Sequence, residues 1–384
     1  MRDPRLDRLA KVLVGYSTRV RPGDIVEVIA EPIALPLIEA IVEQVLHAGG
    51  HPSWRVRSEA VEEILLREGS EEQLRFLSPL ERDRVETIDV HIGLWAEVNT
   101  RYLASVDPAR VAMNRAARRP ITTRFMQRAA EGKLRWVGTQ FPTLASAQDA
   151  EMSLLDYENF VFAAGLLHEH DPAAAWERVH EGQERVRAFL QGKKEVHFQV
   201  PPHDGHDGTD LRISVDGATW INCSGRENFP DGEVFAGPRG ADGHVNYTFP
   251  AVYGGREVEG VRLVFKGGRV VDASARKNEK FLIEMLDQDA GARNLGEIAV
   301  GTNYAIKDFS RNTLFDEKIG GTFHAAVGAG YPESGNTNES GLHWDMVCDL
   351  RRAGKLPGGT IHADGELVQK DGVFAHAGWP GRDD

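Results

Sequence analysis

The sequence predicts an α/β N-terminal domain with a parallel-type sheet, followed by a mainly β (α+β) C-terminal domain. Over the first half of the chain, apolar strand-like runs alternate with amphipathic helical segments. This rhythm is typical of a parallel sheet covered by helices. Beyond about residue 195 the chain changes to short alternating runs separated by glycine turns. That second texture favours antiparallel sheets.

The first strand and the helix after it are the clearest elements of the N-terminal half. "DIVEVIA" (24–30) is typical of a short apolar strand. "ALPLIEAIVEQVLHAGG" follows, and Gly49 and Gly50 end the helix as C-cap glycines do. Its predicted buried face consists of Leu37, Ile38, Ile41, Val42, Val45 and Leu46. Further strands are predicted in "HPSWRVRS", "VHIGLWA" (90–96) and "RWVGTQFPT" (135–143).

Hairpins dominate the predicted C-terminal half. A helix over "PAAAWERVHEGQERVRAFLQG" (172–192) precedes them, and a second helix, "KNEKFLIEMLDQDAG", interrupts them. The predicted turns are Asp216-Gly217, Gly267-Gly268 and Asp371-Gly372. We therefore expect an N-terminal domain over residues 1–192 and a C-terminal domain over residues 193–384.

Length and charge exclude several classes of function. The chain has 384 residues, enough for two domains, and a formal net charge of -13. Nucleic-acid binding would need a basic excess, and so would adhesion to an anionic membrane. The longest apolar run is interrupted by Glu39 and Glu43, and the N-terminus has no apolar signal region. We expect a cytoplasmic protein that binds neither nucleic acid nor membrane. No Gly-x-Gly-x-x-Gly or Walker A loop supports nucleotide binding.

The two cysteines limit the kinds of metal site that are possible. Cys223 and Cys348 are far apart and form no C-x-x-C pair. This excludes a disulfide framework and a thiolate zinc site. Any metal would have to be held by oxygen and nitrogen ligands.

The sharpest candidate is the His343-Trp344-Asp345 run. Residues i and i+2 of a strand share a face, so His343 and Asp345 can hold one ion while Trp344 packs on the other side. A pair of this kind also occurs by chance. His324, in "GGTFHAAVG", lies on another predicted strand, but by itself it is equally well explained as a core histidine.

Two glutamates change this balance. Glu233 follows a Pro-Asp-Gly turn, and Glu297 begins an apolar strand in "GARNLGEIAVG". A carboxylate buried in such a setting needs a cation, which could be an Arg, a Lys or a metal. Together with the two histidines and the aspartate, the set suits Zn²⁺, Co²⁺ or Mn²⁺. Three carboxylates exceed what one catalytic zinc needs, which indicates two ions that share a carboxylate.

Four stretches together resemble the M29 metallopeptidases of the aminopeptidase T/S type. They are "GRENFPDGEVFAGP", "NEKFLIEMLDQDAGARNLGEIAVGTN", "LFDEKIGGTFHAAVGAGYPE" and "NESGLHWDMV". In the N-terminal half the resemblance is looser and rests on "VRPGDIVEVIAEP". It implies an aminopeptidase with two divalent ions that removes single residues from peptides with a free N-terminus. It also implies a homodimer in which the N-terminal domain serves dimerisation or covers the active site.

The resemblance also implies roles for individual residues. The implied metal ligands are Glu233, Glu297, His324, Tyr331, His343 and Asp345. Glu297 and Tyr331 are in addition implied to be catalytic, through proton transfer and stabilisation of the oxyanion. The residues alone do not separate ligand from base between Glu233 and Glu297. Without the resemblance, Tyr331 would be a packed turn residue before Pro332.

The loop between Tyr331 and Asn338 is shorter than in the family pattern, so we expect substrate preference to reside there. Two other functions stay open at this point. His324, His343 and Asp345 would suffice for a mononuclear Fe(II) ring-cleaving dioxygenase of the dihydroxypyridine type. A non-catalytic peptide or metal binder is the other. The two glutamates count against the dioxygenase, and the presence of all six candidate residues counts against the binder.

Overall fold

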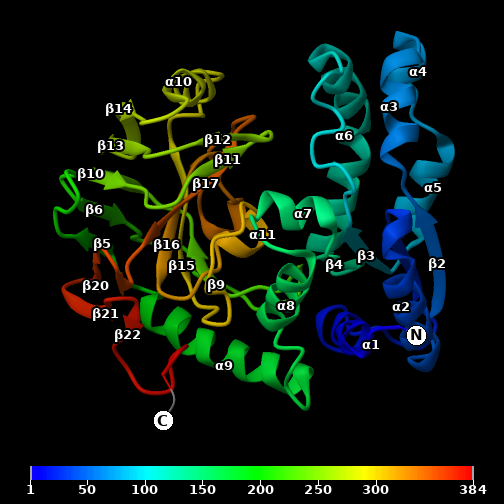
Figure 1. The fold of residues 1–384 in the computed structure, drawn as a ribbon, viewed down its shortest axis with the longest axis horizontal. Coiled ribbons are helices and arrows are strands. Elements are labelled where there is room, and N and C mark those ends of the chain that lie inside the picture. Colours follow the sequence, from blue (N-terminus) through cyan, green and yellow to red (C-terminus); the bar gives the residue numbers. More distant parts are fainter. Residues whose placement is uncertain (1, 383–384) are drawn as a thin grey trace. The chain divides into compact units, whose positions relative to one another are not determined.

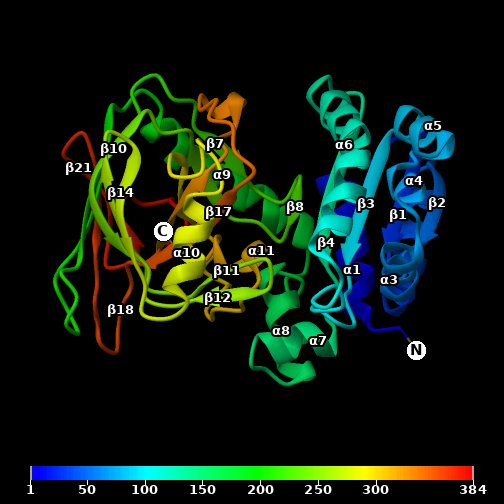
Figure 2. The same cartoon turned by 90° about the horizontal axis from the view of Figure 1, so that it is seen from above.

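The chain folds into two compact units. The computed structural model describes residues 2–382, and Figures 1 and 2 show it from two directions. The first unit runs to Ala174 and also takes in Gly225–Phe229, and all the rest belongs to the second unit.

Helix α9 (Pro172–Leu190) belongs almost entirely to the second unit. It supplies Val186 and Leu190 to that unit's hydrophobic core. The amide of Gln183 on the same helix donates to the carbonyl oxygens of Cys223 and Glu233. The domain boundary expected at residue 192 stays a prediction.

A five-stranded parallel sheet organises the first unit, as the sequence predicts. Its strand order is β2-β1-β3-β4-β8, and every neighbouring pair is parallel. The last strand is contributed by the short segment that returns from the second half of the chain. The strands are β1 (Ile25–Ala30), β2 (His51–Val56), β3 (Val90–Trp95), β4 (Arg135–Gln140) and β8 (Asn228–Phe229).

Six helices of the first unit form two groups, and α7 packs with α8 as a separate pair (Figure 1). In one, α1 packs against α2, which also contacts β1 and β2; in the other, α3, α4 and α5 pack against α6. A π-helical turn (Val12–Ser17) extends α1. The helices are α1 (Pro4–Lys11), α2 (Leu35–His47), α3 (Glu59–Glu68), α4 (Glu71–Arg75), α5 (Pro79–Thr87), α6 (Pro108–Ala130), α7 (Leu144–Asp149) and α8 (Leu154–Ala164).

Helix α2 follows its predicted apolar face with one exception. Leu37, Ile38, Ile41 and Val45 are buried, whereas Leu46 is 57% exposed. Position 46 lies at the edge of the apolar stripe, in the last turn before the helix ends. The glycines after the helix behave as predicted, with a positive φ at the first of them.

Two antiparallel sheets form the second unit. One has eight strands in the order β14-β13-β10-β6-β5-β20-β21-β22, and the other has five in the order β17-β16-β15-β9-β7. The strands of the larger sheet are β5 (Glu195–Val200), β6 (Thr209–Ser214), β10 (Gly240–Asn246), β13 (Arg262–Lys266), β14 (Arg269–Ser274), β20 (Thr360–Ala363), β21 (Glu366–Lys370) and β22 (Val373–Phe374). Those of the smaller sheet are β7 (Ile221–Cys223), β9 (Glu233–Ala236), β15 (Leu295–Gly301), β16 (Thr322–Gly328) and β17 (His343–Asp349). Two short ribbons, β11 (Ala251–Tyr253) with β12 (Arg256–Val258) and β18 (Arg352–Ala353) with β19 (Leu356–Pro357), and the helices α10 (Glu279–Leu286) and α11 (Thr313–Asp316) complete the unit.

One hydrophobic core lies between the two sheets of the second unit. Phe198 of the larger sheet stacks on Phe323 of the smaller one, with ring centroids 4.2 Å apart. The same core includes Ile298, Val327 and Trp344, which line the inner face of the smaller sheet. The opposite face of that sheet is therefore left for polar side chains.

Two of the three predicted hairpins are confirmed and one is wrong. β13 pairs with β14 across Gly267-Gly268, and β21 pairs with β22 across Asp371-Gly372. The turn at Asp216-Gly217 instead carries the chain from β6 in the larger sheet to β7 in the smaller sheet. A tight turn fixes a change of direction but not the partner of the next strand. Across residues 2–382, no helix combines the length and apolarity needed to cross a membrane.

Glu27 is a buried charge at the centre of the parallel sheet. Its carboxylate accepts two hydrogen bonds from Arg84, at 3.0 and 2.9 Å, and lies 3.0 Å from both Arg55 Nε and His91 Nδ1. Burial alone would raise the pKa of Glu27, but the His91 hydrogen bond and the two guanidinium charges lower it to about 2.

We expect Glu27→Gln to lower the free energy of unfolding by about 3 to 5 kcal/mol, because it leaves two guanidinium groups without their carboxylate. The ionised carboxylate stabilises the fold fully above the unfolded pKa of 4.5 and progressively less as the pH falls towards 2. Lowering the pH from 7 to 3 should therefore remove about 2 kcal/mol from the wild type and little from the variant. Denaturant unfolding at pH 7 and pH 3 measures both effects.

Glu43→Gln is the control, because Glu43 forms a solvent-exposed pair with Arg2. It should change the free energy of unfolding little, because water and salt screen an exposed pair. Equal losses in the two variants would contradict the assignment of Glu27 as a structural charge.

Candidate metal centre

Four adjacent strands of the smaller sheet in the second unit carry the residues singled out in the sequence. Glu233 begins β9, Glu297 lies in β15, His324 in β16, and His343 and Asp345 lie in β17. Their side chains gather on the face of the sheet that points away from the core. As predicted, Trp344 between the last two is buried on the opposite side.

A β-bulge at Gly296 places Glu297 on this face. Leu295 pairs with Val327, yet Glu297 pairs with Ala326, so one extra residue lies in β15. A shift of one residue moves a side chain to the other face of a sheet. In a regular strand Leu295 and Glu297 would share one face, and the bulge lets Leu295 face the hydrophobic core while Glu297 faces the opposite side.

Only glycine fits at the bulge. A Cβ at position 296 would lie 2.3 Å from the carbonyl oxygen of Ala329 and 2.7 Å from that of Gly328. The next strand therefore approaches the backbone of β15 at the point where Glu297 is turned outward.

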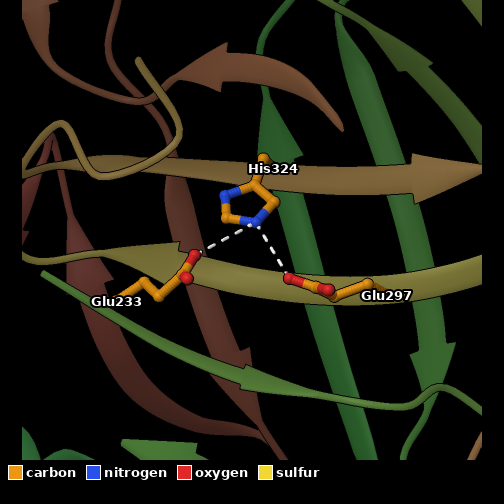
Figure 3. Close-up of side chains that lie close together, drawn as sticks. All are labelled: Glu233, Glu297 and His324. Carbon is orange, nitrogen blue, oxygen red and sulfur yellow. Dashed lines mark hydrogen bonds and ion pairs between the residues drawn. The ribbon is translucent and has the colours of Figure 1, made fainter. Parts of the chain in front are cut away.

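His324 points between two carboxylates (Figure 3). Its Nε2 lies 3.1 Å from Glu297 Oε1 and 3.3 Å from Glu233 Oε2. Nε2 of His343 lies 3.4 Å from Asp345 Oδ1 and 3.8 Å from Glu297 Oε2. The five side chains predicted from the sequence thus form one cluster, and their roles as ligands stay a prediction.

Backbone carbonyls fix both imidazoles. Nδ1 of His324 donates to the carbonyl oxygen of Glu317 at 3.0 Å, and Nδ1 of His343 donates to that of Ala329 at 2.8 Å. A carbonyl can only accept, so Nδ1 carries the proton in each ring. Nε2 therefore faces the carboxylates, which is the arrangement typical of metal-binding histidines.

The negative charges of the cluster favour positive charge at the Nε2 atoms of the two histidines. Burial lowers the pKa of an imidazole, but the Glu297 hydrogen bond and the charges of Glu233 and Asp345 raise the pKa of His324 to about 10. The same opposition, with Asp345 as the main partner, raises the pKa of His343 to about 10. Burial raises the pKa of both glutamates. A proton or a divalent cation on Nε2 would relieve the same electrostatic imbalance.

Two buried carboxylate oxygens favour the binding of a cation at this cluster. Glu233 Oε2 and Asp345 Oδ1 have no hydrogen-bond partner among residues 2–382, although both face an imidazole Nε2. A buried polar atom without a partner is costly. Carboxylate oxygens and imidazole nitrogens form the donor set that Zn²⁺, Co²⁺ and Mn²⁺ accept, so the residues fit such an ion.

The potential ligand atoms form overlapping groups. Glu233, Glu297 and His324 make one, and Glu297, His343 and Asp345 make another, with the ligand atoms of each group within 4.8 Å of one another. A third group, in the part of the chain that the structure describes, joins Glu317 to His324 and Asp345.

Sequence reasoning missed three charged residues at this site, which are Asp231, Glu317 and Lys318. Lys318 is fully buried, and its Nζ lies 3.3 Å from Glu233 Oε1, 3.8 Å from Asp231 Oδ1 and in close contact with Glu317. Burial opposes its charge, but the three carboxylates hold its pKa well above the usual value. For Glu317 and Lys318 the signal was present in "LFDEKIGG", where three consecutive charges stand between apolar residues.

Tyr331 lies at the rim of the cluster. Its ring meets His343 edge-on at 5.2 Å and Phe235 at 5.6 Å, and the residue is 39% exposed. Partial burial and the nearby carboxylates raise the pKa of its hydroxyl group, which therefore stays protonated at neutral pH and can donate.

The loop after Tyr331 is anchored by two asparagines. The buried amide of Asn336 donates to the carbonyl oxygens of Pro238 and Leu295, and that of Asn338 donates to those of Gly291 and Gly328. The loop is thereby fixed against the strand that carries Glu297. Whether it sets substrate preference stays a prediction.

A buried set of imidazoles and carboxylates on a rigid sheet defines the chain as a metalloenzyme. The chain belongs to the thermophilic metalloprotease (M29) family, whose model matches residues 2–374. This confirms the resemblance seen in the four sequence stretches.

Three similar proteins illustrate the relationship. Aminopeptidase 2 of Geobacillus stearothermophilus is 27% identical over 98% of this chain and 98% of its own length. Aminopeptidase AmpS of Bacillus subtilis (strain 168) is 30% identical over 73% of this chain and 74% of its own length. The structure of wild-type AmpT from Thermus thermophilus has a TM-score of 0.82 at 23% identity and covers 97% of this chain and 99% of its own, which shows that the fold is shared.

We expect Gly296→Ala to lower stability by about 1 to 3 kcal/mol, because the added Cβ must displace a neighbouring carbonyl. It should also weaken metal binding, because Glu297 is displaced. Gly240→Ala is the matched control, since a Cβ there meets no atom within 4 Å. Denaturant unfolding and metal titration measure the two effects. Equal metal affinity in both variants would contradict the role of the bulge.

Proposed function

We propose that the chain is an aminopeptidase that uses two divalent ions, Zn²⁺, Co²⁺ or Mn²⁺, to hydrolyse the first peptide bond of peptides with a free N-terminus. The M29 family and the aminopeptidase relatives make it a metallo-exopeptidase. The number of ions, the ligand roles and the peptide substrate are the proposal.

The position of Glu297 carries the proposal of two ions. Its Oε1 faces Nε2 of His324 and its Oε2 faces Nε2 of His343. It is also the residue shared by the first two ligand groups. A carboxylate whose two oxygens face different imidazoles has the geometry of a ligand that two ions share.

The charges of the buried cluster agree with two ions. Five carboxylates lie close to the two imidazoles or to Lys318, the one lysine in this set. They are Asp231, Glu233, Glu297, Glu317 and Asp345. With neutral imidazoles, four negative charges remain, which two divalent cations balance. One ion would leave two uncompensated charges in a buried site, which is costly.

Two bound ions would supply a water of lowered pKa and polarise the scissile carbonyl. The chain itself has to move the proton from the nucleophile to the leaving amine. Glu233 is held through Oε1 by Lys318, whose charge favours the ionised form and opposes the effect of burial. Glu297 has no such lysine contact and lies centrally, so we assign the proton transfer to Glu297.

We assign to Tyr331 the hydrogen bond to the oxyanion. Its protonated hydroxyl group stands at the rim, where a substrate carbonyl would enter. Donors aimed at developing negative charge stabilise the transition state more than the bound substrate.

A small pocket of about 20 Å³ adjoins the cluster, with room for a single ammonium group. Asp316, Glu317 and Asp345 line it and outnumber the lining cation, Arg311, and Val252 and Phe309 supply apolar walls. An α-ammonium group complements that charge, which favours cleavage at the first bond.

The other functions considered from the sequence have less support. A mononuclear iron triad has no use for Glu233 and Glu297, yet both lie within 3.3 Å of His324 Nε2. The family match is to a metalloprotease and not to a dioxygenase. A non-catalytic binder would not need a tyrosine hydroxyl group at the rim.

Purified protein should hold two divalent ions per chain and hydrolyse leucine p-nitroanilide, and chelation should abolish both properties. Glu233→Ala and Asp345→Ala should each lose an ion and reduce kcat/KM by about 10³-fold or more. Glu195→Ala, which removes a surface pair with Arg212, is the control and should change neither. Metal analysis by mass spectrometry and a chromogenic assay give the readouts.

The contrary outcomes point to different functions. One iron per chain with no hydrolysis would replace the peptidase with the dioxygenase. Two ions without turnover of any peptide would indicate a binder.

Tyr331→Phe should lower kcat by about 10²-fold with little change in KM, because the hydroxyl group acts in the transition state. Tyr304→Phe is the matched control, since that hydroxyl group donates to the Gly372 carbonyl oxygen away from the cluster. Steady-state kinetics separates the two. A change confined to KM would show that Tyr331 only contacts the bound substrate.

We also propose that the enzyme works as a homodimer, as the M29 resemblance implies, and that it is cytoplasmic. Light scattering coupled to size-exclusion chromatography measures the mass in solution. A monomer at micromolar concentration would contradict the dimer.

A further inference from the structure

Lys318 is the one lysine inside the metal centre, and the fold holds its backbone in place. It follows α11, where its amide donates to the carbonyl oxygen of Phe315 at 3.1 Å. Its own carbonyl oxygen accepts from the amide of Asn303, whose side chain donates to the carbonyl oxygen of Asp231. The lysine and the turn that leads to Glu233 are thereby tied to one residue.

The ammonium group makes the two oxygens of Glu233 unequal. Oε1 accepts from Lys318 Nζ at 3.3 Å, whereas Oε2 has no hydrogen-bond partner among residues 2–382 and faces His324 Nε2. One oxygen is therefore neutralised by the lysine, and the other remains for a metal ion.

The same ammonium group holds a carboxylate that could otherwise bind metal. Lys318 Nζ contacts Glu317 Oε1 closely. Glu317 forms, with His324 and Asp345, the third group whose ligand atoms lie within 4.8 Å of one another. A cation fixed at Lys318 repels a divalent ion near this group and satisfies its extra carboxylate at the same time.

We propose that Lys318 is a positioning residue: it restricts Glu233 to one metal-binding oxygen and withholds Glu317, so that the centre admits two ions and not three. The inference rests on the proposed two-metal function and adds what limits the number of ions. Lysine suits this role because its ammonium group is a compact point charge on a flexible stem that can reach three carboxylates.

The test is metal binding by apo-protein, measured by equilibrium dialysis against Mn²⁺ or Co²⁺ with mass-spectrometric counting, and by calorimetry. Lys318→Met keeps the bulk of the side chain and removes the charge. It should bind one more ion per chain than the wild type, and the ions common to both should bind with Kd lower by about tenfold or more. Apo-K318M should also melt at a lower temperature than the apo wild type and gain more from added metal, because Glu233 and Glu317 lose their cation.

Lys280→Met is the control for loss of one positive charge, because that side chain is 91% exposed on α10 of the same unit. It should match the wild type in ion number and in Kd. K318M with an unchanged ion number would overturn the proposal.

A second variant keeps the test decisive if K318M fails to fold. Glu317→Gln retains the lysine and should keep the wild-type ion number, with Kd within about threefold. Loss of an ion in E317Q would make Glu317 a ligand and overturn the proposal. In the double variant K318M/E317Q the extra ion or the tighter binding should disappear.

Failure of the proposed two-metal function would be seen in the wild type itself, which would bind a single ion or hydrolyse no peptide. The role of Lys318 is read from the difference between the variants and the wild type in the same titration.

Discussion

The concentration of like charge inside a buried site is the constraint on which the catalytic unit depends. Carboxylates repel one another strongly where water is excluded, and none of them can be buried there without a positive partner. Lys318 supplies one such partner, and the two imidazoles present their Nε2 atoms to the same oxygens. A site of this kind is stable when cations occupy its centre, and the same feature makes it suited to metal-assisted hydrolysis.

The smaller sheet of the second unit holds these groups rigidly. Its inner face is covered by the hydrophobic core, and the four strands that carry the ligands are hydrogen-bonded neighbours. The bulge at Gly296 converts one position of an apolar strand into an outward carboxylate. Carbonyl oxygens of Glu317 and Ala329 fix the two rings, so little reorganisation is needed when metal binds.

Much of the fold was predictable because it depends on local pattern. Period-two runs, the glycine turns and the helix C-cap after α2 all follow from short-range sterics, and the corresponding elements are found. The partner of a strand does not follow from local pattern. The turn at Asp216-Gly217 joins strands of different sheets, because β6 pairs on both sides with β5 and β10 and β7 pairs with β9. Leu46 is exposed for a related reason, since the width of a helix's buried face depends on what packs against it.

The sequence by itself determined the ligand types and the pair on one strand. Cysteine pairs were absent, and the two-residue spacing of His343 and Asp345 places both on one face whatever surrounds them. Only the tertiary structure decided that Glu233, Glu297 and His324 converge with this pair, because strand order and the bulge bring together positions that lie far apart in the chain. It also decided the place of Lys318. A lysine beside two acidic residues is usually on the surface, and here the turn after α11 directs it inward, where the carboxylates make a buried charge favourable.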